Sequence, residues 1–347
     1  MPTVAERKPW LYSRRMDSVI TMSHTAGKIV LEEHFALPDT VDASEKYFTP
    51  DVWPAMRQSL VDIHGRRLEE MDRSGIALMF LSLNSPGPQA LYQRQRAIDL
   101  ARRANDYLAE QVGKNPSRFQ GFAALPMQDP QAAAAELTRC AETLGFRGAL
   151  VNGFSQVDRE DSAVYYDLPQ YWPFWETAER LGLPVYLHPR DMLPSRLQAY
   201  EGHPWLVGAP WGFAADTALH ALRLMGSGLL DRYPKLTIIL GHLGEGLPAS
   251  IWRVDHRIAK TPKGIPARKS MSEYLPTNFV LTTSGNFRTP TLLDAIAEVG
   301  AERIVFSVDY PFEDIAEGAN WLDSAAIADE DRLRIGSQNA RRLFRLT

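Results

Sequence analysis

Glu32 and His34 lie two residues apart, directly after the short apolar segment 28–31. If this segment is a strand that continues to His34, the two side chains project from the same face, because side chains alternate along a strand. A carboxylate and an imidazole in this arrangement can supply half of the ligands of a divalent metal site. An acidic strand end with a capping histidine is the alternative, so the interpretation depends on the rest of the chain.

Three other residues of the same chemical types stand at the ends of apolar segments, namely His188, His242 and Asp309. If these segments are parallel strands of one barrel, their ends share a rim with Glu32 and His34, and the active sites of such barrels lie on that rim. Chance commonly places one such residue at a strand end, but not five. The five residues therefore predict an active site to which four strands contribute.

Two carboxylates and two imidazoles form the predicted metal-ligand set, which consists of Glu32, His34, His188 and Asp309. Such a set suits Zn²⁺ or Mn²⁺ and leaves coordination positions open for a substrate. A second metal ion would need a bridging ligand at the end of the segment 148–152, where the chain has Asn152 and not a lysine. We therefore expect a site for one metal ion.

His242 and Glu245 lie three residues apart in the sequence Gly-His-Leu-Gly-Glu, where a helix is expected to begin. Residues with this spacing can meet on one face of a helix. A carboxylate beside an imidazole fixes its tautomer and raises its basicity, so the pair is a candidate for proton transfer. Helix capping is the alternative role.

The elements that must position these residues form a regular series. Short apolar segments are the expected strands, and a helical segment that often stops at glycine follows each of them. This alternation predicts an α/β protein, and eight such units fit a single (β/α)8 TIM-like barrel. A doubly wound open sheet is the alternative, but no glycine-rich phosphate loop follows the first strand. The expected strands are 28–31, 76–83, 119–125, 148–152, 184–188, 236–242, 279–284 and 303–309.

The predicted barrel occupies residues 27–347 as one domain. Residues 260–278 are expected to be mainly a basic loop, and extra C-terminal helices are expected near 316–326 and 330–344. Residues 1–26 show no periodicity and are predicted to be a flexible N-terminal extension.

Composition excludes several classes of function. The 347 residues carry a net charge of −4 without a basic stripe, which argues against nucleic-acid binding. No apolar run approaches the length of a membrane span. The single cysteine, Cys140, excludes an internal disulfide and a thiolate metal cluster. His220, in the middle of an expected helix, is predicted to be a packing or surface residue. Together these features favour a cytoplasmic enzyme.

Five motifs coincide with the predicted site, and a resemblance follows from them. From about residue 27 to the C-terminus, the chain resembles metal-dependent decarboxylases of the amidohydrolase superfamily, in the branch of aminocarboxymuconate-semialdehyde decarboxylase. The motifs are Leu-Glu-Glu-His-Phe (31–35), Tyr-Leu-His-Pro (186–189), Gly-His-Leu-Gly-Glu (241–245), Thr-Thr-Ser-Gly-Asn-Phe (282–287) and Phe-Ser-Val-Asp-Tyr-Pro-Phe-Glu (306–313). His34 and residues 151–156 are similar to the members that act on 2,6-dihydroxybenzoate, whereas related 2,3-dihydroxybenzoate and salicylate decarboxylases often have alanine in place of this histidine.

The resemblance implies an amidohydrolase-type barrel whose four predicted ligands hold one divalent metal ion per subunit, zinc or manganese, with no organic cofactor. It implies a reversible, non-oxidative decarboxylation of an ortho-hydroxybenzoate, with 2,6-dihydroxybenzoate (γ-resorcylate) as the favoured substrate and resorcinol and CO₂ as the products. Asp309 would deliver a proton to the carbon that bears the carboxylate, and His242 with Glu245 would handle the proton of the ring hydroxyl. The resemblance also suggests a homo-oligomer, either a dimer or a tetramer.

Four further residues are candidates for substrate binding. Arg253 is a candidate for binding an anionic group, with a surface ion pair as its alternative role. Phe35, Asn152 and Phe287 are candidate pocket walls, with packing as the alternative. The alternative functions are a 2,3-dihydroxybenzoate or salicylate decarboxylase, and a lactonase or amidase of the same superfamily. A non-catalytic metal- or ligand-binding protein is a further alternative, although it would have no need of the proton-transferring pair.

Overall fold

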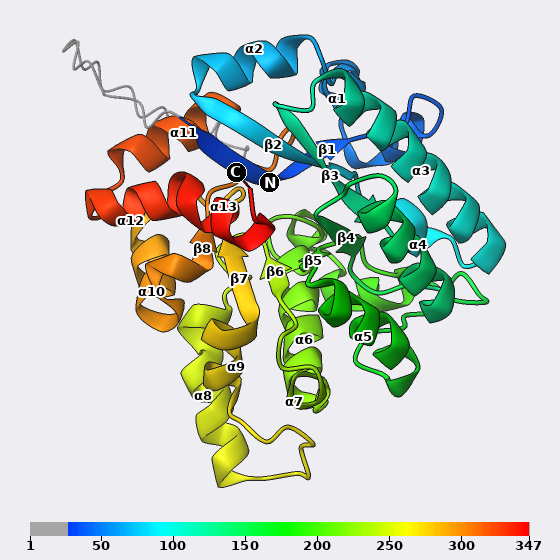
Figure 1. The fold of residues 1–347 in the computed structure, drawn as a ribbon. Helices are drawn as coiled ribbons and strands as arrows, with labels where there is room; N and C mark the ends of the chain where they lie inside the picture. The colour runs from blue at the N-terminus through cyan, green and yellow to red at the C-terminus, as the bar shows by residue number, and fades with distance from the viewer. Residues whose placement is uncertain (1–26, 347) are drawn as a thin grey trace, which may run out of the picture.

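Eight parallel strands form one sheet, in which their spatial order is the same as their order in the sequence (Figure 1). The computed structural model describes residues 27–346, so the predicted extension, residues 1–26, lies outside the described residues, as does Thr347. The strands are β1 (Lys28–Phe35), β2 (Ile76–Leu83), β3 (Phe119–Ala124), β4 (Gly148–Asn152), β5 (Val185–His188), β6 (Ile238–Leu240), β7 (Phe279–Thr282) and β8 (Ile304–Val305).

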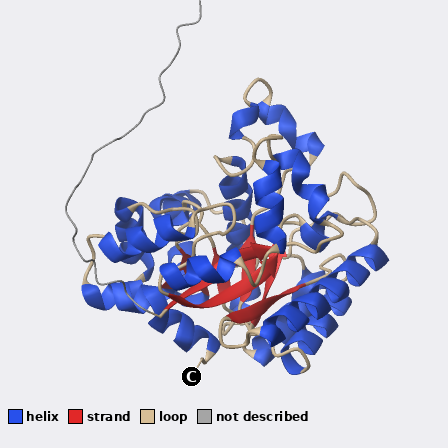
Figure 2. Ribbon diagram, turned by 90° about the horizontal axis from the view of Figure 1, so that it is seen from above, coloured by secondary structure: helices blue, strands red, loops and turns tan. Residues whose placement is uncertain are grey.

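Helices surround the strands on the outside (Figure 2). The repeated alternation of strand and helix confirms the predicted α/β barrel, and α11, α12 and α13 are the extra C-terminal helices. The helices are α1 (Trp53–Val61), α2 (Arg66–Arg73), α3 (Arg94–Lys114), α4 (Pro130–Glu142), α5 (Trp172–Leu181), α6 (Gly212–Gly226), α7 (Leu229–Arg232), α8 (Leu247–Lys260), α9 (Met271–Asn278), α10 (Thr289–Val299), α11 (Ile315–Ser324), α12 (Asp329–Leu333) and α13 (Asn339–Phe344).

Two helical regions differ from the sequence-based expectation. The segment before β7 was expected to be a loop, but it contains α9, whose first turn is stabilised by a capping box between Ser270 and Glu273. The last expected helix is divided, because a π-helical turn at Arg334–Gln338 separates α12 from α13. Two strands are also shorter than expected: β6 ends at Leu240 and β8 at Val305, so His242 and Asp309 lie in the loops that follow these strands.

Apolar side chains fill the part of the barrel interior that lies near the beginnings of the strands. Phe344 of α13 packs against Phe80, with ring centroids 4.3 Å apart, and α13 thereby covers the end at which the strands begin. Burial of these side chains is the main favourable contribution to folding. The other buried members of this interior cluster are Ile29, Leu31, Phe122, Leu150, Tyr186, Ile239, Val280, Val305 and Ala340.

A register shift in β1 decides which of its side chains face the interior. Leu31 belongs to the interior cluster, and Val30 belongs to the core between the sheet and the helices. Strict alternation would therefore turn Glu32 outward. The pairing of β1 with β2 instead shifts between Val30 and Glu33, which is the mark of a β-bulge. Beyond this shift Glu32 and His34 face the interior, and Glu33 faces the other side of the sheet.

The strand ladder is not closed between β8 and β1. Within residues 27–346, ladders join neighbouring strands in series from β1 to β8, and none joins β8 to β1. The two strands are connected by a backbone hydrogen bond from His34 N to Tyr310 O (2.7 Å) and by the side chains of Glu33 and Ser307. We call this region, which comprises residues 31–34 and 307–310, the seam.

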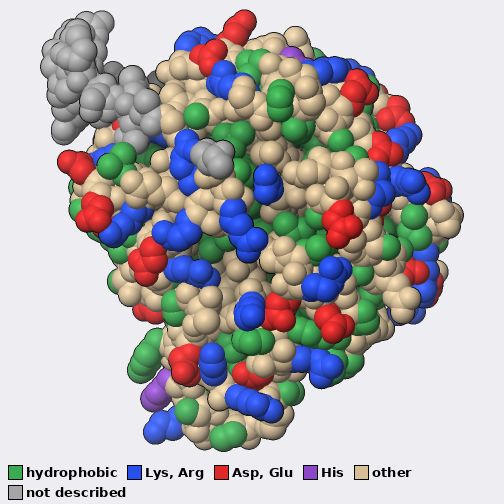
Figure 3. All heavy atoms as spheres, in the orientation of Figure 1, with side chains coloured by type: hydrophobic (Ala, Val, Ile, Leu, Met, Phe, Trp, Pro, Cys, Tyr) green, Lys and Arg blue, Asp and Glu red, His purple; other side chains and the backbone are tan. Residues whose placement is uncertain are grey.

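Acidic and basic side chains are both spread over the face of the molecule shown in Figure 3, with apolar side chains between them. Among residues 27–346, no helix has both the length and the apolar composition that crossing a membrane requires.

His220 is a buried residue of α6, as expected for a packing role. The backbone N–H of Tyr166 donates a hydrogen bond to its Nε2 atom (3.1 Å), and the rings of Tyr165 and Tyr166 pack against it. Burial, assisted by the charge of Arg223, lowers the pKa of His220 to about 3. The folded protein therefore excludes a proton that the unfolded chain binds below about pH 6.5.

We expect His220 to make the protein less stable in mild acid. As the pH falls below about 6.5, its contribution lowers the free energy of unfolding with a slope that approaches about 1.4 kcal/mol per pH unit. Urea unfolding at a series of pH values measures this slope. His220→Gln keeps a hydrogen-bond acceptor for Tyr166 but does not titrate, so its slope should be shallower. Equal slopes in the two proteins would contradict the expectation.

Candidate active site

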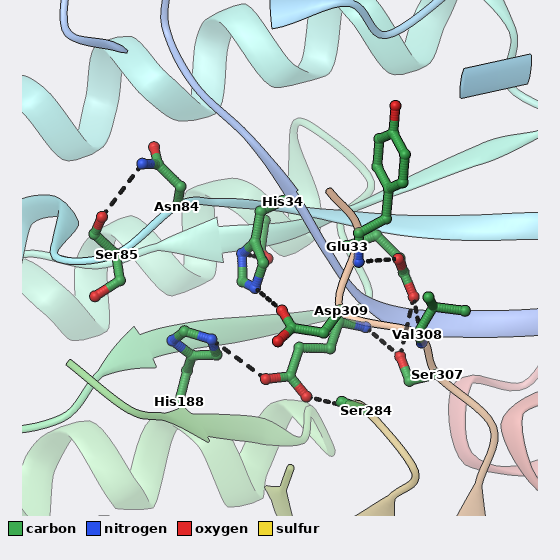
Figure 4. A network of polar contacts seen from close by, with 12 residues as sticks. Glu33, His34, Asn84, Ser85, His188, Ser284, Ser307, Val308 and Asp309 are labelled. Carbon is green, nitrogen blue, oxygen red and sulfur yellow. Dashed lines mark hydrogen bonds and ion pairs between the residues drawn. The ribbon is translucent and has the colours of Figure 1, made fainter. Parts of the chain in front are cut away.

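The side chains of Glu32, His34, His188 and Asp309 converge, and Figure 4 shows the last three from close by. Each offers one ligand atom, and these atoms all lie within 4.8 Å of one another. His34 Nε2 lies 3.1 Å from Asp309 Oδ1, and His188 Nε2 lies 3.2 Å from Glu32 Oε1. The sequence-predicted ligand set is thus brought together from β1, β5 and the loop that follows β8.

The unpaired atoms of this group fit a metal ion. Glu32 Oε1, His34 Nε2 and Asp309 Oδ1 are buried and make no hydrogen bond of good geometry, although each lies close to another atom of the same group. Such atoms are costly to bury alone, and a shared divalent cation would satisfy all three together. Two imidazoles and two carboxylates are suitable ligands for zinc or manganese. The group is therefore a candidate metal site.

Hydrogen bonds on the far side of each imidazole orient the Nε2 atoms toward the site. His188 Nδ1 lies 2.8 Å from Asn152 Oδ1, and His34 Nδ1 lies 3.2 Å from Ser82 Oγ. Because an amide oxygen only accepts, Nδ1 of His188 carries the proton and its Nε2 lone pair is free for a metal ion. Burial lowers the pKa of His34, which favours the neutral imidazole that a metal ion needs.

Three hydroxyl groups hold the second carboxylate oxygen of Glu32. Tyr186, Thr282 and Ser284 all donate to Oε2, from strand β5 and from the end of β7, and Figure 4 shows the contact with Ser284. We call these three residues the hydroxyl cradle. Because it occupies Oε2, the other oxygen of Glu32 is left to face His188. The carboxylate is thus oriented for a single contact to a metal ion.

His242 and Glu245 are in contact, but not in the way that the sequence suggested. His242 Nδ1 lies 2.8 Å from Glu245 Oε1. Both residues precede α8 in a turn whose five consecutive residues, 242–246, have positive φ values, 51° at His242 and 56° at Glu245 among them. The expected face of a right-handed helix is therefore replaced by a left-handed turn. For residues other than glycine such a conformation costs roughly 1–2 kcal/mol each.

This pair borders the predicted metal ligands on their more open side. His242 Nε2 lies 3.7 Å from Asp309 Oδ2 and 3.9 Å from Glu32 Oε1, and the side chain of His242 is 26% exposed. Burial lowers the pKa of His242, but the carboxylates of Glu245, Glu32 and Asp309 outweigh burial and raise its pKa well above the usual value. His242 is thereby placed and charged to exchange protons with a molecule at the site.

Two of the four candidate substrate-binding residues, Phe35 and Phe287, pack against aromatic side chains of helices. Phe35 points to the side of β1 opposite to His34 and stacks on Tyr107 of α3, with ring centroids 6.0 Å apart. Phe287 packs against Trp321 of α11, at 5.7 Å. For both phenylalanines the geometry favours the packing alternative.

Asn152 and Arg253, the other two candidates, lie in different surroundings. Asn152 is buried and supports His188 from behind, so its side chain is committed to a ligand of the predicted metal site. Arg253 is exposed on α8. Contact of these residues with a substrate stays a prediction.

Several site residues carry little signal in a single sequence. Ser82 and Tyr186 stand in apolar strands, where nothing in the local pattern identifies their partners. Thr282 and Ser284 do carry a signal, because two hydroxyl residues two apart at the end of a buried strand face the same way. Phe312 is a further addition: its ring centroid lies 5.4 Å from that of His34, and it is 38% exposed.

Comparison with known proteins shows the family to which the chain belongs. A family model described as amidohydrolase matches residues 37–346. A γ-resorcylate decarboxylase of Polaromonas sp. is 57% identical over 322 residues, which cover 92% of this chain and 99% of that protein. The chain therefore belongs to the amidohydrolase family, and the resemblance drawn from its motifs is confirmed.

Solved structures of decarboxylases are also similar to this chain. The crystal structure of a 2,6-dihydroxybenzoate decarboxylase complexed with 2,6-dihydroxybenzoate matches with a TM-score of 0.91 and 55% identity, covering 92% of this chain and 100% of that one. A dihydroxybenzoic acid decarboxylase of Polaromonas sp., solved with manganese and the inhibitor 2-nitroresorcinol, matches with a TM-score of 0.90 and 56% identity, covering 92% and 97%. Within its family the chain is a decarboxylase, that is, a carbon–carbon lyase, similar to the γ-resorcylate decarboxylases.

Proposed function

We propose that the protein catalyses the reversible, non-oxidative decarboxylation of 2,6-dihydroxybenzoate to resorcinol and CO₂. The observation that carries the proposal is the 55–57% identity to γ-resorcylate decarboxylases across 92% of the chain. The convergence of the predicted ligand set beside the His242–Glu245 pair supports it. A 2,3-dihydroxybenzoate or salicylate decarboxylase is the alternative of the same reaction class.

The four converging side chains would hold one divalent ion, manganese or zinc. When bound, this ion supplies positive charge that fixes and polarises the oxygen atoms of the substrate. Glu32 and His188 are oriented for this task by the hydroxyl cradle and by Asn152 respectively. His34 is held by Ser82. Manganese is the ion in the related Polaromonas structure, which supports manganese as the first metal to test.

Asp309 is proposed to protonate the ring. In its protonated form it gives its proton to the carbon that bears the carboxylate, the bond from that carbon to the carboxylate then breaks, and its electron pair restores the aromatic ring as CO₂ leaves. The reaction consumes one proton, which solvent returns to Asp309. The side chain of Asp309 is only 14% exposed, so the ring competes with little water for this proton.

His242 with Glu245 is proposed to handle the proton of the ring hydroxyl. Electron density on the hydroxyl oxygen makes the ring carbon a better proton acceptor, and an imidazole beside that oxygen controls this density. Glu245 holds Nδ1 of His242, so that Nε2 is directed toward Asp309 and the open side of the site. Phe312 is a candidate surface for the aromatic ring, because it is half-exposed beside His34.

The proposal also covers the domain organisation, the oligomeric state and the cellular location of the protein. Residues 27–347 would act as one catalytic domain, in a cytoplasmic homo-oligomer with two or four subunits. Arg253, exposed on α8, stays a candidate for binding the anionic group of the substrate, with a surface ion pair as its alternative role.

Metal removal and a substrate panel test the proposal together. Chelation should abolish CO₂ release, and one equivalent of Mn²⁺ or Zn²⁺ per subunit should restore it. Metal binding should also stabilise the fold, by about 2.7 kcal/mol when free metal is 100 times its dissociation constant. The panel comprises 2,6- and 2,3-dihydroxybenzoate and salicylate, with chromatographic detection of the phenol.

The same reaction mixtures separate decarboxylation from hydrolysis. In water enriched in ¹⁸O, a lactonase or amidase incorporates the label into its organic product, whereas a decarboxylase forms a phenol without added oxygen. Release of CO₂ from 2,6-dihydroxybenzoate supports the proposal. Activity on lactones or amides alone, with all three hydroxybenzoates intact, would refute it.

A further inference from the structure

The seam between β8 and β1 is held by two buried polar side chains that the proposed reaction does not use. Ser307 Oγ accepts hydrogen bonds from two consecutive backbone N–H groups, those of Leu31 (2.9 Å) and Glu32 (2.6 Å), and it donates one to Glu33 Oε1 (3.2 Å). Two successive N–H groups that share one acceptor mark the bulge in β1. The bonds of Ser307 therefore coincide with the shift that turns Glu32 into the barrel.

Glu33 binds the chain on both sides of Asp309. Its Oε1 accepts from Val308 N (2.9 Å) and its Oε2 accepts from Tyr310 N (2.9 Å), as Figure 4 shows for the carboxylate and its neighbours. Asp309 itself has a φ of 84°, which is uncommon for a residue with a side chain. Such conformations persist where surrounding contacts fix the chain, and here one carboxylate fixes it before and after the residue.

The buried side chain of Arg67 also spans the seam. The Arg67 guanidinium is fully buried, lies over the ring of Tyr310 at 4.7 Å and donates to the backbone carbonyl of His34 (2.7 Å). It thus contacts both chain segments of the seam. Because a buried polar side chain is costly unless hydrogen-bond partners surround it, the bonds that Glu33 makes to Ser307, Val308 and Tyr310 indicate a specific structural role.

We propose that Glu33 is the positioning residue for Asp309: its carboxylate takes the place of the missing β8–β1 ladder and sets the backbone conformation that aims Asp309 at the metal ligands. A strand would offer one carbonyl for each N–H. The carboxylate instead offers two acceptors from one residue, which lets the chain turn sharply at Asp309 between two fixed amides. The catalytic importance of Asp309 rests on the proposed function, but its placement by Glu33 does not.

Glu33→Gln is the direct test, because glutamine has the same shape but only one oxygen. One of the two amides then faces an NH₂ group and loses its acceptor. We expect faster hydrogen exchange at the amides of 308–310, and Mn²⁺ binding by calorimetry that is weaker by about 10- to 100-fold, the usual cost of losing a group that orients a ligand. With Mn²⁺ saturating, kcat should remain lowered.

Asn339→Ala is the matched control. Asn339 is buried and also fixes backbone next to β8, by donating to Ala301 O (2.8 Å) and Ile304 O (2.7 Å), but at the opposite end of the strand. It should lower the thermal stability of the protein while leaving Mn²⁺ affinity unchanged. If Glu33→Gln behaves like this control, with a lower melting temperature but normal Mn²⁺ affinity and normal exchange at 308–310, Glu33 has only a general structural role and the proposal is overturned.

Two further outcomes keep the proposal testable. If Glu33→Gln does not fold, Glu33→Asp is measured instead: its shorter carboxylate reaches one amide at a time, so exchange at 308–310 should still rise, and unchanged exchange and Mn²⁺ affinity would overturn the proposal. If the wild-type protein releases CO₂ from no hydroxybenzoate, the proposed function fails. The exchange and Mn²⁺ measurements, which need no substrate, then still decide the role of Glu33.

Discussion

Asp309→Asn should reduce kcat for CO₂ release by about 10³-fold or more. Asparagine keeps the size of the side chain and an oxygen that can face the metal ligands, but it has no proton to deliver to the ring. General acid catalysis contributes on the order of 10²–10⁴-fold to a rate, and 10³-fold corresponds to about 4 kcal/mol in the activation barrier. Binding of the aromatic ligand should partly survive, because the other three ligand side chains remain.

The measurement must separate the loss of the proton donor from the loss of metal. Turnover is followed as resorcinol formation with Mn²⁺ in excess, and metal content and ligand binding are determined on the same sample. Asp314→Asn makes the same chemical change five residues away, at the N-cap of α11, where the aspartate accepts a hydrogen bond from Glu317 N (2.9 Å). It should leave kcat near the wild-type value. Near-normal turnover of Asp309→Asn would remove Asp309 from the proposed chemistry.

His242→Asn should lower kcat by about 10²- to 10⁴-fold while metal content changes little. Asparagine is the suitable replacement, because it tolerates the left-handed backbone that His242 adopts, with a φ of 51°. Most other residues would disturb the turn as well as remove the imidazole. His256→Asn, which replaces an exposed histidine of α8 that stacks on Trp252, is the control and should be fully active. A His242→Asn protein that purifies without metal would instead identify His242 as a ligand.

Glu245→Gln tests the same pair by removing only the charge of the carboxylate. Glutamine keeps an oxygen that can accept from Nδ1 of His242, but it removes the negative charge that raises the pKa of the imidazole. The pKa of His242 should therefore fall, and the limb of the rate–pH profile that reports it should move to lower pH. The loss of kcat should be smaller than in His242→Asn. An unshifted profile would mean that the charge of Glu245 does not govern His242.

Sequence alone determined the parts of this protein that depend on local spacing. The i, i+2 relation of Glu32 and His34 follows from the geometry of any strand, so their common face needed no tertiary information. The eight alternating strands and helices specify the barrel, and a barrel places residues such as His188 at one rim whatever lies between them. The ligand set could be predicted for this reason.

The tertiary structure decided which face and which direction those residues take. Regular alternation from Leu31 would have turned Glu32 outward, and only the bulge in β1, held by Ser307 from the far end of the chain, turns it inward. The meeting of His242 with Glu245 was predicted from helical spacing, yet a left-handed turn produces it. The bulge depends on a contact between residues 275 positions apart, which no local pattern records.

Two phenylalanines, Phe35 and Phe312, also show that the tertiary structure decides the direction of side chains near the site. Phe35 belongs to a motif of the site, but one step along a strand reverses the side-chain direction, and it packs on Tyr107 behind the sheet. Phe312 stands beside His34 because the chain turns at Asp309, between two amides that Glu33 binds. Sequence thus determined which chemical groups the site contains, because residue type and local period are written in the chain. Only the tertiary structure decided how they point, because most of the hydrogen bonds that orient them come from other strands and loops, such as the bond from Ser284 to Glu32 and the bond between Asn152 and His188.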